Sequence, residues 1–243
     1  MAMQINPNVA PGQNGATKLH QEEFMSTSPD NDSFLVLSYL SLRKAIGLLG
    51  ACLPFVLAIG LFVLYSKGLQ GSISGYYHTE MRDVFVGTLC AIGVFLLSYR
   101  GYDSKDRVAG ILAAVFAIAT ALFPTTPHVM SPTHMDKVKG AIHFTSAALF
   151  LLTLAYFSLR LFTKTDPKHS PTQRKINRNR IYLVCGYTIV AAIALIAIYK
   201  ILPDDIEKRL AELKPVFWLE SIAVVAFGIS WLTKGEAILK DRT

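Results

Sequence analysis

Six long apolar segments constrain the fold of this chain more than any other feature of its sequence. Each is about 16 to 23 residues long, the length at which a helix crosses a bilayer core of about 30 Å. Within a bilayer core, a single segment pairs all of its backbone N–H and C=O groups only as a helix. The sequence therefore predicts an all-α integral membrane protein with six transmembrane helices, and it argues against a soluble globular domain. The expected spans are about 45–65, 84–99, 108–123, 140–162, 181–202 and 215–233.

Outside these segments the chain is polar. Residues 1–42 are rich in Asn, Gln, Ser, Pro and Gly, a composition that predicts a disordered tail. Residues 43–235 form the expected transmembrane domain, and 236–243 form a short C-terminal tail. The overall hydrophobic content of 52% is only slightly above that of a soluble protein. The grouping of apolar residues into segments, and not their number, therefore determines the predicted class.

Basic residues predict the orientation of the chain. The N-terminal tail, the loops after the second and fourth spans, and the C-terminus together carry 16 of the 24 Lys and Arg residues. Loops on the cytoplasmic side of a membrane carry an excess of Lys and Arg. Both termini are therefore expected in the cytoplasm, with the protein integral to the plasma membrane as a multi-pass chain.

The most basic segment of the chain is the loop 164–180, which is expected to lie on anionic lipid headgroups. A Lys or Arg near such a surface contributes about 1 kcal/mol to the attraction. The net charge of +7 would suggest nucleic acid as a partner in a soluble protein, but here most of the excess lies beside membrane spans. The sequence therefore predicts membrane lipids as partners and no nucleic acid.

A row of small residues marks the third span. Ala109, Ala113, Ala117 and Ala121 recur every four residues, which places them on one face of a helix. Small residues in a row let a second helix approach closely. The row predicts a packing surface, either within the chain or between copies in a homo-oligomer.

Ionisable residues gather on the predicted outer side. His143 lies about one turn inside the fourth span, Glu220 lies five residues inside the sixth, and Lys200 lies near the outer end of the fifth. An ionisable group inside a bilayer is costly and by default marks a functional site. In the structural alternative, Glu220 pairs with Lys200 or hydrogen-bonds a neighbouring helix, and His143 is a hydrogen-bonded core histidine.

The segment 72–83 is the most polar stretch that precedes a span. Tyr77 suits the membrane–water interface, where an amphipathic ring is half wet. His78 and Asp83 are five residues apart, so an early start of the second span would bring them within about a turn and a half. They would then share a cation, or Asp83 would orient a ligand histidine. Arg82 is expected to pair with a headgroup or a carboxylate.

The outer loop 124–136 contains two further histidines and is stiffened by three prolines. His128 and His134 would cap a site from above or remain solvated, and their spacing matches no strong metal motif. The motifs HExxH, Walker A, GxSxG and GxGxxG are absent from the chain. Zincin, P-loop, α/β-hydrolase and dinucleotide-binding functions are therefore not predicted.

The run Ser74-Gly75-Tyr76-Tyr77-His78, followed by Asp83, has the spacing SxxxH with an acid shortly after it. It resembles one element of the superfamily of alkaline ceramidases and progestin/adiponectin-type receptors, which are seven-helix membrane hydrolases that hold zinc. The resemblance implies that His78 is a zinc ligand and that Ser74 and Asp83 are site residues. The chain has no HxxxH pair, so His143 and Glu220 would supply the missing ligands.

The chain as a whole, including 99–103 and 231–235, also resembles bacterial six-helix inner-membrane proteins. That resemblance implies a place in the bacterial inner membrane and carries no mechanism.

Three hypotheses for function follow from the sequence. In the first, a zinc ion held by His78, His143 and either Asp83 or Glu220 activates water for hydrolysis of a lipid ester or amide. In the second, the same groups form a channel, a proton or solute pathway, or a pH sensor. In the third, the protein is a non-catalytic scaffold, accessory subunit or lipid-binding component.

Overall fold

The computed structural model describes residues 29–99, 103–127, 131–165 and 170–239. The chain divides into two units, Met1–Tyr39 and Leu40–Thr243. In the first unit the described residues, 29–39, are helical. In the second unit every described element of regular secondary structure is a helix. The expected all-α class is therefore confirmed for the described part of the chain.

Six long helices correspond to the six apolar segments. They are α2 (Pro29–Tyr65), α3 (Arg82–Leu97), α4 (Ser104–Leu122), α5 (His134–Tyr156), α6 (Gln173–Lys200) and α8 (Pro215–Lys234). The shorter elements are the 3-10 helix η1 (Ser74–His78), the π-helical turn η2 (Phe157–Leu161), which continues α5, and the helix α7 (Asp204–Ala211). All of these long helices except α8 begin before the expected spans, by eight residues in α6, because polar residues extend each helix beyond its apolar segment; α8 begins at Pro215, as expected.

Four helices of the described chain are long and apolar enough to cross a membrane. They are Tyr39–Tyr65, His134–Leu161, Gln173–Lys200 and Pro215–Lys234. The helix α3 has only 16 residues, and the first turn of α4 contains charged residues, so neither is among these four. These four helices support an integral membrane protein.

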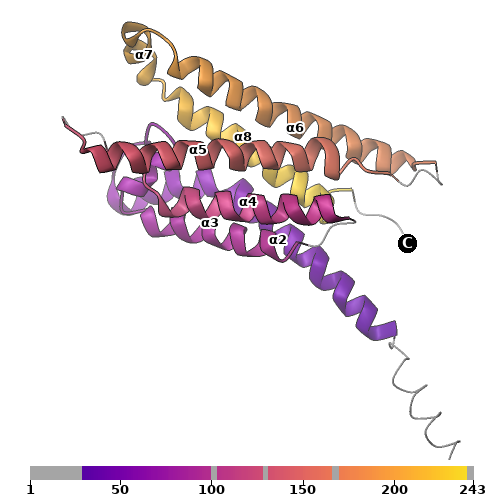
Figure 1. The fold of residues 1–243 in the computed structure, drawn as a ribbon. Helices are drawn as coiled ribbons and strands as arrows, with labels where there is room; N and C mark the ends of the chain where they lie inside the picture. The colour runs from indigo at the N-terminus through magenta and orange to yellow at the C-terminus, as the bar shows by residue number, and fades with distance from the viewer. Residues whose placement is uncertain (1–28, 100–102, 128–130, 166–169, 240–243) are drawn as a thin grey trace, which may run out of the picture. The chain divides into compact units, whose positions relative to one another are not determined.

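The long helices of the second unit run in alternating directions along a common axis, as Figure 1 shows. In space α3 packs on α4, α4 on α5, α5 on α6, and α6 on α8. This alternation collects the helix ends into two sets. We call one the basic end, defined by Arg43, Lys164, Lys175, Arg178 and Lys234. We call the other the histidine end, defined by His78, His134 and His143.

Close backbone contact joins α2 to α8. A Cβ atom added at Gly47 would lie 2.8 Å from the carbonyl oxygen of Gly228, and one added at Gly228 would lie 2.6 Å from the Cβ atom of Ala51. Neither helix has room for a larger side chain at this crossing. Association between helices in lipid relies on such contacts, because burial of apolar surface supplies little driving force there.

The alanine row serves the packing of α4 within the chain. Ala109 is 5% exposed, and Ala113, Ala117 and Ala121 are fully buried. On the side of α3, a Cβ atom added at Gly93 would lie 2.8 Å from the side chain of Ile118. The burial of the row thus fits the intrachain alternative.

Local capping defines where three of the helices begin. The side chain of Asp103 accepts a hydrogen bond from the backbone N–H of Asp106 at the start of α4. Thr133 and Asp136 form a capping box at the start of α5, and Thr172 caps α6. These side chains satisfy backbone donors that have no partner inside the helix.

The N-terminal tail differs from the expectation. The helix α2 begins at Pro29, so residues 29–42 of the expected disordered tail are helical. They are continuous with an apolar helix, and propagation of a formed helix costs far less than its nucleation. The rest of that tail, residues 1–28, lies outside the described residues.

Candidate functional site

At the histidine end, Glu220 binds backbone groups of a distant loop. Its Oε2 atom accepts hydrogen bonds from the N–H of Ile73 at 2.6 Å and of Ser74 at 3.4 Å. Ile73 and Ser74 are buried and begin η1, so the carboxylate satisfies donors at the start of that helix. Lys200 pairs with Glu207 at 2.9 Å. The geometry therefore corresponds to a hydrogen bond between elements and not to a Glu220–Lys200 pair.

Further contacts fix the same loop against the first turn of α8. The N–H of Phe217 donates to the carbonyl of Gly71 at 3.0 Å, and the Lys214 ammonium donates to the carbonyl of Leu69. The buried ring of Tyr76 lies 6.3 Å from that of Phe217. Glu220 is thus one of several groups that fix the loop between α2 and α3 in place.

Two predicted metal ligands, His143 and His78, bind one short segment. The Nδ1 atom of buried His143 donates to the carbonyl of Phe123 at 2.7 Å. The Nε2 atom of exposed His78 lies 2.9 Å from the carbonyl oxygen of Thr125 and 3.1 Å from its hydroxyl oxygen. Because a carbonyl oxygen only accepts, these hydrogen bonds form in the tautomers that carry a proton on His143 Nδ1 and on His78 Nε2. Both histidines therefore act as donors that hold the connection between α4 and α5.

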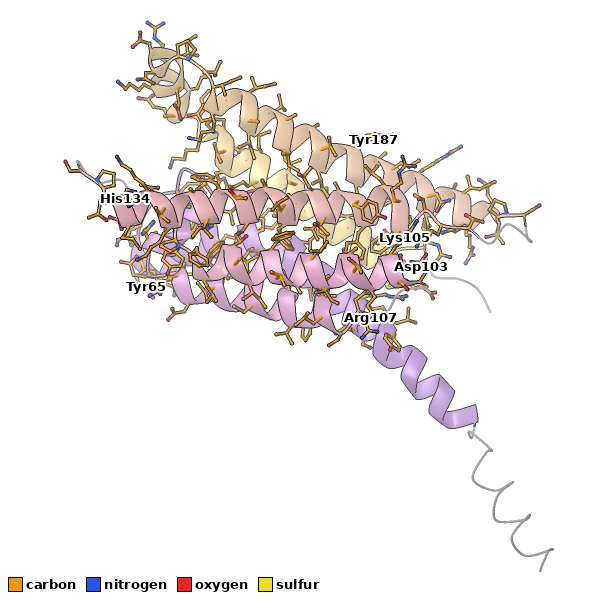
Figure 2. The ribbon with its side chains drawn as sticks, viewed as in Figure 1. Tyr65, Asp103, Lys105, Arg107, His134 and Tyr187 are labelled. Atoms are coloured by element: carbon orange, nitrogen blue, oxygen red, sulfur yellow. The ribbon has the colours of Figure 1, made fainter. Side chains whose placement is uncertain are left out.

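Other predicted site residues of this end lie apart. Asp83 is exposed in the first turn of α3 and makes no hydrogen bond to His78. The Arg82 guanidinium lies 4.8 Å from the centre of the Tyr77 ring and donates to its hydroxyl at 3.2 Å. His134 is exposed at the start of α5, as Figure 2 shows. His128 lies outside the described residues.

Three residues that the sequence resemblance assigns to a zinc site, Glu220, His78 and His143, each hydrogen-bond backbone groups. No group of three or more His, Cys, Asp and Glu side chains among them is close enough to hold a metal ion. The Oε2 atom of Glu220 accepts from two backbone donors, and His78 Nε2 lies against the carbonyl of Thr125. The predicted residues share one end of the bundle without forming one coordination sphere.

The basic end contains a set of aromatic rings centred on buried Trp231 of α8. The ring of Phe162 lies 5.2 Å away, Tyr99 5.2 Å, and Phe157 5.5 Å. Tyr182 of α6 extends the set through Phe162 at 5.4 Å. The π-helical turn η2 carries Phe157 into this set, and such turns recur at functional sites.

Three cations lie on these rings. The Arg43 guanidinium is 5.7 Å from the Tyr99 ring, and the Lys234 ammonium is 5.5 Å from the Phe162 ring. The Lys175 ammonium is 5.9 Å from the Tyr182 ring and donates to the carbonyl of Phe162 at 2.9 Å. Such distances are those of cation–π attraction.

The charges at this end act on one another. Lys234 is repelled by Arg43, Lys175 and Arg178 and is attracted by Asp106. Arg178 lies 4.0 Å from Glu236. Arg43, Lys175, Arg178 and Lys234 are all half-buried. We call these four cations, together with Tyr99, Phe157, Phe162, Tyr182 and Trp231, the basic–aromatic cluster.

An ion pair borders the basic–aromatic cluster. The Lys164 ammonium lies 2.6 Å from buried Asp106 and 3.0 Å from exposed Asp103. Hydrogen bonds from Lys164 and from the Asp106 N–H hold the pKa of Asp103 below its usual value. Burial alone would lower the pKa of Lys164, but the two carboxylates raise it above its usual value. Both groups are therefore charged at neutral pH.

Sequence patterns identified only part of the basic–aromatic cluster. The loop 164–180 was expected to be basic, and it contributes Lys175 and Arg178. Arg43 and Lys234 lie far from that loop in the sequence. A usable signal was nonetheless present, because each of these two residues adjoins an end of an apolar segment predicted to lie on the basic side.

Comparison of the chain with known protein families, curated proteins and solved structures finds no match.

Proposed function

We propose that this chain is a non-catalytic, six-span membrane protein that binds anionic phospholipid headgroups at its basic end. The proposal rests on one observation, the convergence of three half-buried cations, Arg43, Lys175 and Lys234, on a set of aromatic rings, with a fourth cation near Lys234. The cations come from α2, α6 and α8, so the fold assembles them from separate parts of the chain.

Charge supports an anionic ligand. Arg43, Lys175 and Arg178 repel Lys234, and Asp106 and Glu236 offset part of this positive charge. A phosphate group among them converts this repulsion into attraction, and Arg and Lys are the side chains that bind phosphate. The basic–aromatic cluster therefore favours a ligand with at least one negative charge.

The position of the cluster supports a lipid as the source of that charge. Four of its rings, Phe157, Phe162, Tyr182 and Trp231, belong to or adjoin three helices that are long and apolar enough to cross a membrane. Aromatic and basic side chains at such ends suit the headgroup level of a bilayer. The excess of Lys and Arg on this side favours the cytoplasmic leaflet, where anionic lipids give a negative surface potential.

The geometry gives the other two hypotheses less support. A zinc hydrolase needs several ligands around one ion, and Glu220 and His78 are already hydrogen-bonded to backbone groups. A solute pathway needs polar groups along the helices. The buried serines Ser158 and Ser230, whose hydroxyl oxygens are 2.8 Å apart, instead hydrogen-bond each other.

Trp231 supplies a direct test, because the chain has only two tryptophans and the second, Trp218, is replaced in a Trp218→Phe background. This variant is purified in neutral detergent and titrated with phosphatidylglycerol, with phosphatidylcholine or with inorganic phosphate alone. Saturable changes of Trp231 emission are expected with phosphatidylglycerol and not with phosphatidylcholine. Adding Arg43→Gln should weaken the apparent affinity about fivefold, since one charge near the anion contributes about 1 kcal/mol.

Lys208→Gln is the matched control, because it removes one exposed charge from α7 at the histidine end. It should leave the titration unchanged. Equal responses to the two lipids would contradict the proposal. A full response to inorganic phosphate alone would show a soluble anion site in place of a lipid site.

A further inference from the structure

An open groove runs along the outside of the bundle between α4 and α5. Its volume is about 510 Å³, within the range of small-molecule sites. The wall on α4 consists of Ser104, Lys105, Val108, Leu112 and the small residue Ala109. The wall on α5 consists of Leu149, Leu152, Thr153 and Tyr156. Eight residues of α4 separate the ends of its wall, a length of about 12 Å.

The groove is polar at one end and apolar along the rest. Ser104, Lys105 and Tyr156 lie toward the basic end, where α4 begins and α5 finishes. Figure 2 places Lys105 and Asp103 at this end, opposite His134. The Thr153 hydroxyl donates to the carbonyl of Leu149 at 2.7 Å, so the wall beyond the polar end offers little hydrogen bonding.

We infer that this groove binds one anionic phospholipid, with an acyl chain along α4 and α5 and the phosphate beside Lys105. Charge complementarity selects this occupant: the Lys105 ammonium and the hydroxyls of Ser104 and Tyr156 match a phosphate, and the leucines match an acyl chain. A helix of a second copy would also match the leucines. Its polar or apolar turn, however, would offer no negative charge to the Lys105 ammonium.

The wall residues support a lipid rather than an internal contact. Val108 is 54% exposed, Leu112 44%, and Leu152 46%, so the chain itself leaves them uncovered. In a bilayer, acyl chains cover such residues. Ala109, 5% exposed, has no side chain long enough to fill the space between the two helices. The groove therefore offers one acyl chain more contact than a smooth helix surface would.

A photoactivatable phosphatidylglycerol with a diazirine on one acyl chain tests the inference on the full chain in nanodiscs. Adducts mapped by mass spectrometry should concentrate on residues 104–112 and 149–156. Leu152→Trp fills the groove and should remove most of these adducts. Leu195→Trp is its control, because Leu195 is 50% exposed on α6 and does not line the groove.

Two charge variants test the polar end. Lys105→Gln should lower groove adducts about fivefold, whereas Arg107→Gln should not change them. Arg107 is exposed two residues further along α4 and does not line the groove. Arg43→Gln should also leave them unchanged, which separates this inference from the proposed headgroup site. Adducts spread evenly over the helices, equal adducts in Leu152→Trp and Leu195→Trp, or a cross-linked dimer that excludes the lipid would overturn the inference.

Discussion

The two ends of the bundle use their ionisable side chains in different ways. At the histidine end, Glu220, His143 and His78 each bind backbone groups of the connections between helices. At the basic end, Arg43, Lys175 and Lys234 lie on aromatic rings and act on one another.

This difference shows how a polar group near a membrane span is to be interpreted. A carboxylate or imidazole beside irregular backbone has a structural use, because loops leave N–H and C=O groups without partners. Like charges that the fold brings together repel one another, as Arg43, Lys175 and Arg178 repel Lys234, so they favour a bound anion. The basic end is therefore the better candidate for a ligand, even though the histidine end has the more reactive side chains.

The largest effect is expected from Trp231→Ala at the basic end. The side chain is fully buried and contacts Tyr99, Phe157 and Phe162, so its removal leaves a cavity. The expected loss of stability is about 3–5 kcal/mol. Thermal unfolding in detergent measures it, with Trp218→Ala as the control because Trp218 is 55% exposed. Equal losses in both variants would show that the cluster does not stabilise this end.

At the histidine end, Glu220→Ala should cost about 1–3 kcal/mol, because the N–H groups of Ile73 and Ser74 lose their acceptor. Glu220→Gln keeps an oxygen acceptor and should retain most of the stability. Thermal unfolding of both variants separates a hydrogen-bonding role from a role that needs the charge. A Glu220→Gln protein as unstable as Glu220→Ala would argue against the structural role.

The smallest effect concerns the exposed pair Asp103–Lys164 at the basic end. The folded chain holds the pKa of Asp103 below its unfolded value, so the pair stabilises the protein above that unfolded value. Its contribution is lost as the pH falls through the lowered folded-state pKa. Asp103→Asn should therefore lower the melting temperature slightly at neutral pH. The difference from wild type should shrink as the pH falls below about 4, the usual value of an Asp carboxyl, and vanish below the lowered folded-state pKa. A difference that grows in acid would contradict this assignment.

The sequence predicted the class of the fold, because apolar length and helical pairing are local properties. The alanine row of α4 was likewise visible, since spacing alone places Ala109 and Ala113 on one face. The start of α2 at Pro29 was not predicted, because the composition of residues 29–42 favours disorder when it is considered without the apolar helix that follows.

Contacts between distant segments were beyond sequence reasoning. Glu220 binds Ile73, which precedes it by 147 residues, and no spacing rule connects the two. The approach of Arg43 to Lys234 depends on the crossing of α2 and α8 at Gly47 and Gly228. Periodicity shows which face of a helix is apolar, but it does not show which helix lies beside it.

Counting bound lipids by native mass spectrometry tests the central claim most directly. Wild type, Arg43→Gln/Lys234→Gln and the charge-matched control Lys137→Gln/Lys208→Gln are exposed to equal amounts of phosphatidylglycerol and phosphatidylcholine. The basic–aromatic cluster predicts that wild type and control retain phosphatidylglycerol selectively, and that the double variant at the basic end retains at least one phosphatidylglycerol fewer. The same number of retained phosphatidylglycerol molecules in all three proteins, or no selectivity in wild type, would contradict a lipid site at the basic end.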